Sequence, residues 1–146
     1  GHLFTEPVNL GRMVTRDSEL VFPVNPRIVM ADGRPVVPFS GPVAILVDEL
    51  TASASECFAG GLQSVRRARV FGRATAGQVL PASTKRLTGG DLLMYVVGDF
   101  LTADGRRLEG VGVVPDEPVA LDPVALRQGR DPDLEAALRW LDRQAG

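Results

Sequence analysis

The apolar run Val43–Val47 constrains the fold more than any other stretch of this chain. Its five residues, VAILV, are rich in β-branched side chains without polar alternation, a pattern typical of a strand covered on both faces. Gly41-Pro42 introduces the run, and residues from Thr51 to about Val65 follow with apolar side chains at helical spacing. The sequence therefore predicts a buried parallel strand, a tight turn and a helix in succession.

Shorter strands and turns are expected on both sides of this unit. Residues 12–15 (RMVT) and 19–24 (ELVFPV) have strand-like compositions within a proline-rich stretch. A short strand is expected at 69–71, and two strands at 84–97 flank the turn signal Thr-Gly-Gly-Asp of a β-hairpin. We expect these later strands to join the same sheet in antiparallel orientation.

The chain divides into three parts on this pattern. We expect residues 1–40 to be an irregular, strand-containing segment leading into the core, and residues 41–121 to form the core itself. Residues 122–146 are expected to form a linker and a C-terminal amphipathic helix, with Asp131 as N-cap and Pro132 at its first position. One stripe of that helix is apolar: Leu134, Ala137, Leu138 and Leu141.

Composition excludes several classes of protein. The 146 residues are 45% hydrophobic, which suits one globular domain. The formal net charge of −2, with no basic run longer than two residues, argues against a nucleic-acid partner. The longest apolar run is far shorter than the roughly 20 residues of a membrane span. A single cysteine, Cys57, excludes an internal disulfide framework, and no metal-ligand cluster or phosphate loop is present, so no cofactor is predicted.

Ser53 stands where the expected helix begins, and two roles fit a serine there. Ser53 and Glu56 form the Ser-x-x-Glu pattern of a capping box, in which each side chain bonds the other residue's backbone amide. A serine at a helix N-terminus also suits a nucleophile, because the positive dipole end and the unpaired amides stabilise an oxyanion. The local pattern favours the cap, and Ser55 is expected to be a small packing residue.

Three longer segments favour the nucleophile over the helix cap as the role of Ser53. They are GPVAILVDELTASASECFAGGLQ, RARVFGRATAG and LLMYVVGDFLTADGRRLEGVGVVPD. In order and spacing, from about Gly41 to Val119, they resemble the C-terminal-processing (tail-specific) serine peptidases and their tricorn-like relatives. The most specific pieces are TASASE at 51–56 and EGVGVVPD at 109–116. The resemblance implies an α/β fold with a crotonase/ClpP-like (β-β-α) core, a mixed sheet with packed helices, of which this chain is a partial domain.

The resemblance also implies roles for individual residues. Ser53, the first serine of Ser-Ala-Ser-Glu, would be the nucleophile, and the backbone N–H of Ala54 an oxyanion donor. The tail-specific branch uses a lysine base, but Gln78 stands at that position, and a carboxamide is not basic. In the tricorn-like branch the base is a histidine supported by a glutamate, for which Glu109 is the candidate; the alternative for Glu109 is an ordinary surface carboxylate. Lys85, the only lysine, is expected to be a solvated strand residue.

Two expected parts of the machinery are missing from these 146 residues. They are the general base and the Arg-Gly-Asn-x-Gly-Gly strand that supplies the second oxyanion donor in the family. The chain also begins with Gly1-His2, which is similar to a tag remnant. We therefore expect the C-terminal part of the catalytic domain of a serine endopeptidase, inactive by itself.

The expected partners follow from this interpretation. They are a peptide or protein substrate and the remaining N-terminal part of the same chain, and the sheet edges of a partial domain also favour a homodimer. The competing interpretation is a non-catalytic module that keeps the peptidase fold and binds a ligand or peptide, as the glutamine at position 78 suggests. The resemblance favours an extracytoplasmic (periplasmic or secreted) location over a cytoplasmic one.

Overall fold

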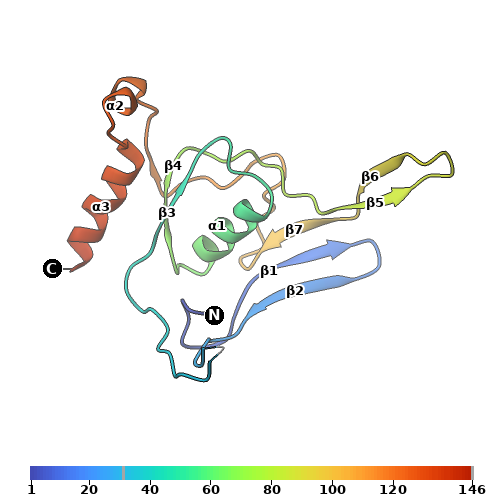
Figure 1. Cartoon of the computed structure of the whole chain (residues 1–146), viewed down its shortest axis with the longest axis horizontal. Coiled ribbons are helices and arrows are strands. Elements are labelled where there is room, and N and C mark those ends of the chain that lie inside the picture. The colour runs from blue at the N-terminus through green and yellow to red at the C-terminus, as the bar shows by residue number, and fades with distance from the viewer. Residues whose placement is uncertain (31, 146) are drawn as a thin grey trace.

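The structure is a computed structural model that describes residues 1–30 and 32–145 (Figure 1). Within these residues the elements follow in this order: β1 (Val8–Thr15), β2 (Glu19–Val24), β3 (Ala44–Val47), α1 (Ala54–Ser64), β4 (Arg69–Gly72), β5 (Ala82–Arg86), β6 (Leu92–Val96), β7 (Gly98–Thr102), β8 (Glu117–Pro118), α2 (Pro123–Arg127) and α3 (Pro132–Ala145). The predicted strand, turn and helix are thus confirmed, and the fold is the expected mixture of sheets and helices.

The strands form three separate sheets, and the two larger ones contact helix α1. One sheet has the order β2-β1-β7 and is antiparallel, the second has the order β3-β4-β8 and is parallel, and β5 pairs with β6 alone. Helix α1 contacts β1, β7 and β4, whereas α3 contacts β3 and β4. Figure 1 shows α1 and α3 on opposite sides of β3 and β4. Helix α1 therefore joins the two larger sheets.

The run Val43–Val47 forms a strand of a parallel sheet, as predicted. The prediction that this strand is buried on both faces is wrong. β3 pairs in parallel with β4, from Ala44 opposite Arg69 to Val47 opposite Gly72. Among the described residues β3 has this one neighbour, and its Leu46 is 41% exposed. The buried strand is β4, whose Val70 and Phe71 are almost inaccessible. An edge strand is covered less completely than the strand it flanks.

The expectation that all later strands join the parallel sheet is wrong. The hairpin at 84–97 forms, as β5 and β6, but it pairs with no other strand among the described residues and projects from the body (Figure 1). β7 instead pairs with β1, which together with β2 confirms the strands expected in residues 1–40. Gly98 allows this close pairing, because a Cβ there would lie 2.5 Å from the carbonyl oxygen of Val14.

The C-terminal helix begins as predicted. The Asp131 carboxylate accepts hydrogen bonds from the amides of Asp133 and Leu134, each at 3.1 Å, and Pro132 is the first helical residue. The predicted apolar stripe is partly wrong, because Leu134 and Leu138 are about half exposed. The contact with the sheet comes from the buried Ala137 and from Trp140, whose ring centroid lies 5.7 Å from that of Phe71.

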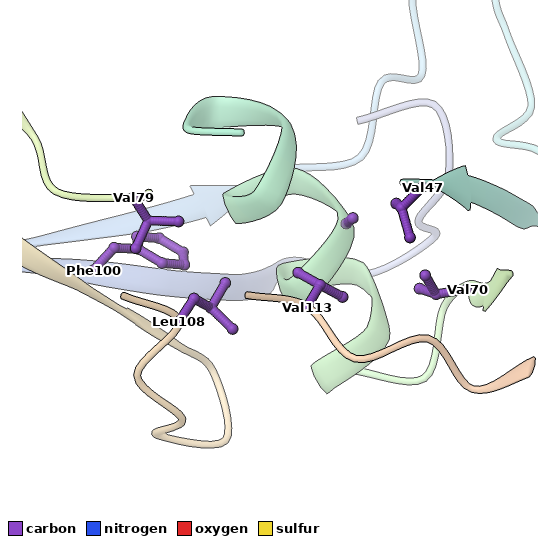
Figure 2. Close-up of a cluster of buried hydrophobic side chains, with 7 residues drawn as sticks. Val47, Val70, Val79, Phe100, Leu108 and Val113 are labelled. Carbon is purple, nitrogen blue, oxygen red and sulfur yellow. The ribbon is translucent and has the colours of Figure 1, made fainter. Parts of the chain in front are cut away.

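The hydrophobic core gathers side chains from both larger sheets and from α1 (Figure 2). Its buried members are Val47, Ala59, Val70, Val79, Phe100, Leu108 and Val113. Val79, Leu108 and Val113 lie outside the regular elements, so the core also fixes the loops around the start of α1. These loops carry the candidate functional residues.

Truncating the centre of this core should destabilise the fold. Val70 is 0% exposed, so Val70→Ala removes two buried methyl groups, and we expect a loss of about 2 kcal/mol in the free energy of unfolding. The control is Val37→Ala, at a residue that is 88% exposed, with an expected change within about 0.5 kcal/mol. Urea denaturation of both variants gives the comparison, and equal losses would contradict this description of the core.

Candidate active site

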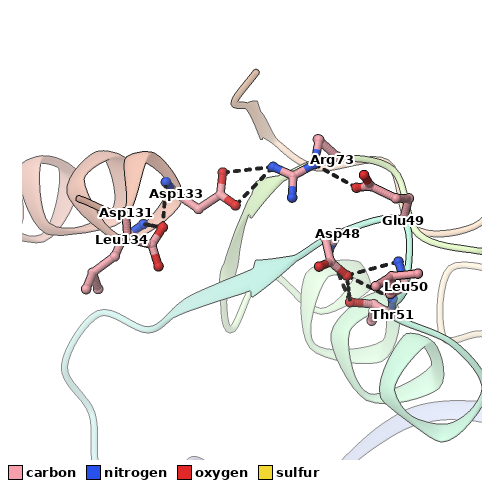
Figure 3. A network of polar contacts seen from close by, with 8 residues as sticks. All are labelled: Asp48, Glu49, Leu50, Thr51, Arg73, Asp131, Asp133 and Leu134. Atoms are coloured by element: carbon pink, nitrogen blue, oxygen red, sulfur yellow. Dashed lines mark hydrogen bonds and ion pairs between the residues drawn. The ribbon is translucent and has the colours of Figure 1, made fainter. Parts of the chain in front are cut away.

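The turn between β3 and α1 is held by side-chain hydrogen bonds (Figure 3). The Asp48 carboxylate accepts from the amides of Leu50 and Thr51, both at 3.0 Å, and from the Thr51 hydroxyl at 3.1 Å. The Thr51 hydroxyl in turn accepts from the Asp48 amide at 3.1 Å. The direction of the backbone that leads into Ala52 and Ser53 is therefore fixed.

Arg73 ties the same turn to α3 (Figure 3). Its guanidinium donates to Glu49 at 2.7 Å and to Asp133 in the first turn of α3 at 3.1 Å. The pKa of the Glu49 carboxyl group is lowered, first by a hydrogen bond from the Glu49 backbone and second by the Arg73 guanidinium. The bond to Glu49 likewise raises the pKa of Arg73. Through its ion pairs with Glu49 and Asp133, Arg73 links the terminal helix to the segment that leads into the candidate site.

Ser53 has a strained backbone conformation. Its φ of 60° and ψ of −127° are typical of the first central residue of a type II′ turn, a position that glycine usually occupies. An ordinary N-cap residue has an extended backbone, so capping alone does not require this geometry. Such strain costs on the order of 1–3 kcal/mol and is concentrated at functional sites. A sharp strand-to-helix turn of this kind is how several hydrolases expose a nucleophilic serine.

The predicted capping box is confirmed, and it forms chiefly through Glu56. The Ser53 amide donates to the Glu56 carboxylate at 3.0 Å. In the other direction the Glu56 amide faces the Ser53 side chain, as a capping box requires, but its hydrogen bond of regular geometry, 2.9 Å long, is to the Ser53 carbonyl oxygen. Ser53 is exposed, so its hydroxyl can be reached from solvent.

Glu56 does more than cap the helix. It is 0% exposed, and its carboxylate accepts four hydrogen bonds. One oxygen accepts from the Thr75 hydroxyl and from the Gly77 amide at 2.7 Å; the other accepts from the amides of Gln78 at 2.9 Å and Ser53 at 3.0 Å. The carboxylate thus holds the loop 75–78 against the first turn of α1.

A third segment is fixed to the same loop. The Thr75 hydroxyl accepts from the Val113 amide at 2.7 Å, within the motif at 109–116. The backbones approach closely there, because a Cβ at Gly112, where φ is +76°, would lie 2.5 Å from the Thr75 carbonyl oxygen. The structure therefore brings together the three motifs TASASE, TAG and EGVGVVPD. Sequence reasoning missed the central role of Glu56 and Thr75, although both lie in the segments that carry the family resemblance.

Gln78 lies at the end of the loop 75–78, and Glu109, from the motif at 109–116, bonds the residue that follows it. Gln78 contributes its backbone: its carbonyl oxygen accepts from the Ser53 amide at 3.0 Å, whereas its side chain is exposed. The Glu109 carboxylate accepts from the Val79 amide at 2.8 Å. The adjacent residues Gln78 and Val79 thereby link Ser53 to Glu109.

The first turn of α1 offers a backbone donor but no base. The Ala54 amide opens the helix and has no intrahelical acceptor, so it is available to an oxyanion. The Ser53 hydroxyl forms no hydrogen bond to a side chain within residues 1–30 and 32–145. Lys85 lies in β5 of the projecting hairpin, and His2 lies at the chain terminus, where its carbonyl oxygen accepts from the Phe39 amide.

Metal-ligand clusters and membrane-spanning helices are both absent from the described ranges. Residues 1–30 and 32–145 contain no group of three or more histidine, cysteine, aspartate and glutamate side chains arranged to hold a metal ion. Their helices are all too short or too polar to cross a bilayer.

Cys57, one turn into α1, is half-buried. Burial, and second the neighbouring Glu56 carboxylate, raise the pKa of its thiol to about 11, against 9.0 for an ordinary cysteine. We expect the folded protein to alkylate at Cys57 about 100-fold more slowly than a free cysteine peptide near pH 8, with the rate still rising above pH 9. Mass-spectrometric labelling kinetics from pH 7 to about 9.5 measure this, and rates equal to those of the peptide would contradict the burial.

The arrangement of these elements is found in known peptidases. A peptidase from Parabacteroides merdae aligns with 96% of this chain and 44% of its own, with a TM-score of 0.75 at 20% identity. The photosystem II D1 C-terminal processing protease aligns with 96% of this chain and 33% of its own, with a TM-score of 0.66 at 28% identity. The tricorn protease covers 73% of this chain with 11% of its own, with a TM-score of 0.61 at 21% identity. The predicted fold class is thereby confirmed.

The sequence comparisons define the class more narrowly. The profile of peptidase family S41 matches residues 2–119, and the chain belongs to that family. A CtpA-like serine protease of Staphylococcus haemolyticus is 40% identical over 78 residues, which are 53% of this chain and 16% of that protein. The corresponding protein of Staphylococcus epidermidis is 37% identical over the same length. The chain thus spans about one sixth of the length of these relatives, and the predicted resemblance is confirmed.

Proposed function

We propose that this chain supplies the nucleophile of a serine endopeptidase. The observation that carries the proposal is the strained, exposed Ser53 at the start of α1, whose backbone is held by Glu56 and Gln78. Strain is retained in a folded protein where the surroundings over-determine it, as these hydrogen bonds do. Membership of peptidase family S41 and the similarity to CtpA-like serine proteases support the same chemistry.

In the proposed reaction, the Ser53 hydroxyl attacks a peptide carbonyl carbon while its proton passes to a general base. The resulting oxyanion accepts a hydrogen bond from the Ala54 amide, aided by the positive end of the α1 dipole. The C–N bond then breaks, the amine leaves with the proton, and water hydrolyses the acyl-serine ester by the reverse sequence. No metal or cofactor takes part.

The general base comes from outside residues 1–146. Gln78 has no useful basicity, so it is not the base, and Glu109 is assigned to orient the missing base through the carboxylate oxygen that does not hold the Val79 amide. Residues 41–121 then form the C-terminal part of the catalytic core, preceded by residues 1–40 and followed by residues 122–146. The edge of β3 that pairs with no strand among the described residues is assigned to the remaining N-terminal part of the chain.

Comparing the isolated chain with the whole protein tests this division. The whole protein is expected to cleave peptides and the 146-residue chain to be inactive, because the chain lacks a base. In the whole protein, Gln78→Ala is expected to change kcat/KM by less than about threefold, since the Gln78 side chain is exposed and the residue bonds Ser53 through its backbone, which the substitution keeps. A loss of about 100-fold or more in Gln78→Ala, or turnover by the isolated chain that Ser53→Ala abolishes, would contradict the assignment.

The remaining partners and the location belong to the same proposal. The substrate class is a peptide or protein, and an extracytoplasmic site of action is favoured by the tail-specific resemblance. A homodimer through β2 or β3 is the alternative to a partner within the same chain, because both are edge strands among the described residues. Sedimentation of the whole protein separates the two, since a monomer excludes the homodimer.

The second candidate function is a non-catalytic binding module with the same fold. The observation that favours it is the glutamine at position 78, exposed where the tail-specific peptidases carry lysine. This alternative predicts that the whole protein binds peptides without turnover and that Ser53→Ala leaves the affinity unchanged. Peptide cleavage by the whole protein, lost in Ser53→Ala, excludes it.

A further inference from the structure

A polar pocket of about 430 Å³ opens at the C-terminal end of α1, whereas Ser53 lies at the other end of this helix. The pocket is bounded by the residues that precede β3, by those that join α1 to β4, and by Trp140 of α3. Because α1 has 11 residues, roughly 16 Å of helix separates the pocket from Ser53. Its volume lies within the range of small-molecule sites.

Positive charge dominates the lining of this pocket. Three arginines line it, Arg66, Arg67 and Arg69, against one acidic residue, Asp116. Arg69 forms an ion pair with Glu117, and its buried Nε atom has no hydrogen-bond partner among the described residues. Neither Arg66 nor Arg67 forms an ion pair within residues 1–30 and 32–145. Two guanidinium charges of the pocket are therefore not paired with a carboxylate there.

The backbone of neighbouring segments holds Arg67 in place. Its guanidinium donates hydrogen bonds to three carbonyl oxygens, those of Leu3 at 2.6 Å, Gly41 at 3.0 Å and Phe39. Carbonyl acceptors fix the direction of a guanidinium but carry no net charge, and arginine does not lose its proton in proteins. The positive charge of Arg67 is therefore a fixed property of the pocket.

Arg66 occupies a backbone position that favours glycine. Its φ of 56° lies in the left-handed region, just after the C-cap Val65 of α1, where glycine commonly ends a helix. The Arg66 side chain is not needed as a cap, because amides of residues 65–67 donate to the last carbonyl oxygens of the helix. A strained residue of this kind indicates a role for its side chain, and Arg66 is exposed at the pocket.

We propose that this pocket binds a small organic anion that carries a carboxylate or phosphate group. Arg66 donates hydrogen bonds to the anionic group, since a guanidinium matches the geometry of both oxyanions, and Arg67 adds a second positive charge. Trp140 and Val43 offer apolar surface to the rest of the ligand. The Asp116 carboxylate opposes the anion, but the two unpaired guanidinium charges outweigh it. This proposal does not depend on the role of Ser53.

Calorimetric titration of the whole protein at constant ionic strength tests the proposal. The probes are phenyl phosphate and benzoate, with benzyl alcohol as their uncharged counterpart. One of the two anions is expected to bind about tenfold or more tightly than benzyl alcohol, because hydrogen bonds to a charged group are strong. Tighter binding of phenyl phosphate assigns the site to phosphates, and tighter binding of benzoate assigns it to carboxylates. Equal affinity for all three probes, or no binding, overturns the proposal.

Two variants at Arg66 locate the site. Arg66→Gly removes the guanidinium where glycine is unstrained, so the affinity for the anion is expected to fall about tenfold or more. Its thermal midpoint without ligand is expected to equal or exceed that of the wild type. Arg66→Gln removes the charge but keeps a side chain at the same backbone angles, and the same loss of affinity is expected.

Arg16→Ala is the matched control for these variants. It removes an exposed arginine that does not line the pocket, so the affinity for the anion is expected to stay unchanged. Wild-type affinity in both Arg66 variants overturns the proposal. An equal loss of affinity in Arg16→Ala also overturns it, because the anion is then attracted by the overall charge of the protein and has no specific site.

Discussion

Replacing Ser53 by alanine is expected to lower kcat/KM of the whole protein for peptide substrates by about a thousandfold to a millionfold. The substitution removes the oxygen that forms the acyl ester and leaves the Ala54 amide in place. Residual turnover would then reflect the oxyanion donor and substrate binding alone. Steady-state kinetics with a peptide that the wild type cleaves give the ratio, and the KM should change little.

Ser55→Ala is the matched control for this prediction. Ser55, two residues after Ser53, is exposed, so the prediction that it packs was wrong, and its substitution is expected to change kcat/KM by less than about threefold. Ser53→Gly adds a thermodynamic control, because glycine accepts a φ of 60° without strain. We expect Ser53→Gly to be inactive and about 1 kcal/mol more stable than Ser53→Ala. A larger loss of activity in Ser55→Ala than in Ser53→Ala would reassign the nucleophile.

Removing the Glu56 carboxylate is expected to cost about 3–5 kcal/mol of unfolding free energy. Glu56→Ala leaves four hydrogen-bond donors without their acceptor at a site that is 0% exposed. It also frees the loop 75–78 from the start of α1, so the geometry around Ser53 is lost. Urea denaturation followed by circular dichroism measures the change.

Two variants control the Glu56 prediction. Glu56→Gln keeps the side-chain volume but places an NH₂ group against backbone donors, and we expect an intermediate loss of about 2 kcal/mol with a lower kcat in the folded protein. Glu6→Ala removes an exposed glutamate, with an expected change within about 0.5 kcal/mol. Equal stability of Glu56→Ala and wild type would show that the hydrogen bonds around Glu56 do not hold the site.

The local elements of the fold were predictable because their signals are local. The run VAILV, the capping residue Asp131 and the turn at residues 88–91 each depend on neighbours within a few positions, and the structure confirms the elements they predict. Strand partners were not predictable in the same way. The pairing of β7 with β1 joins residues far apart in sequence, and Gly98 shows its purpose only beside Val14.

The site shows the same limit. The Ser-x-x-Glu pattern predicted the hydrogen bond between Glu56 and the Ser53 amide, which the structure confirms. It did not predict the bonds to Thr75, Gly77 and Gln78, because these donors lie about 20 residues further along the chain. The strain at Ser53 was also invisible, since nothing in the sequence reports a backbone angle. The nucleophile was assigned from the family resemblance, and its geometry now supports that proposal.

The central claim is that Ser53 is a reactive nucleophile, activated by a base from outside residues 1–146. Treating the whole protein with a fluorophosphonate and locating the adduct by peptide mass spectrometry tests it most directly. The expected result is one adduct, on Ser53, which is absent from the isolated 146-residue chain and from the Ser53→Ala variant. An unmodified Ser53 in the whole protein, or an adduct that persists in Ser53→Ala, would contradict the account.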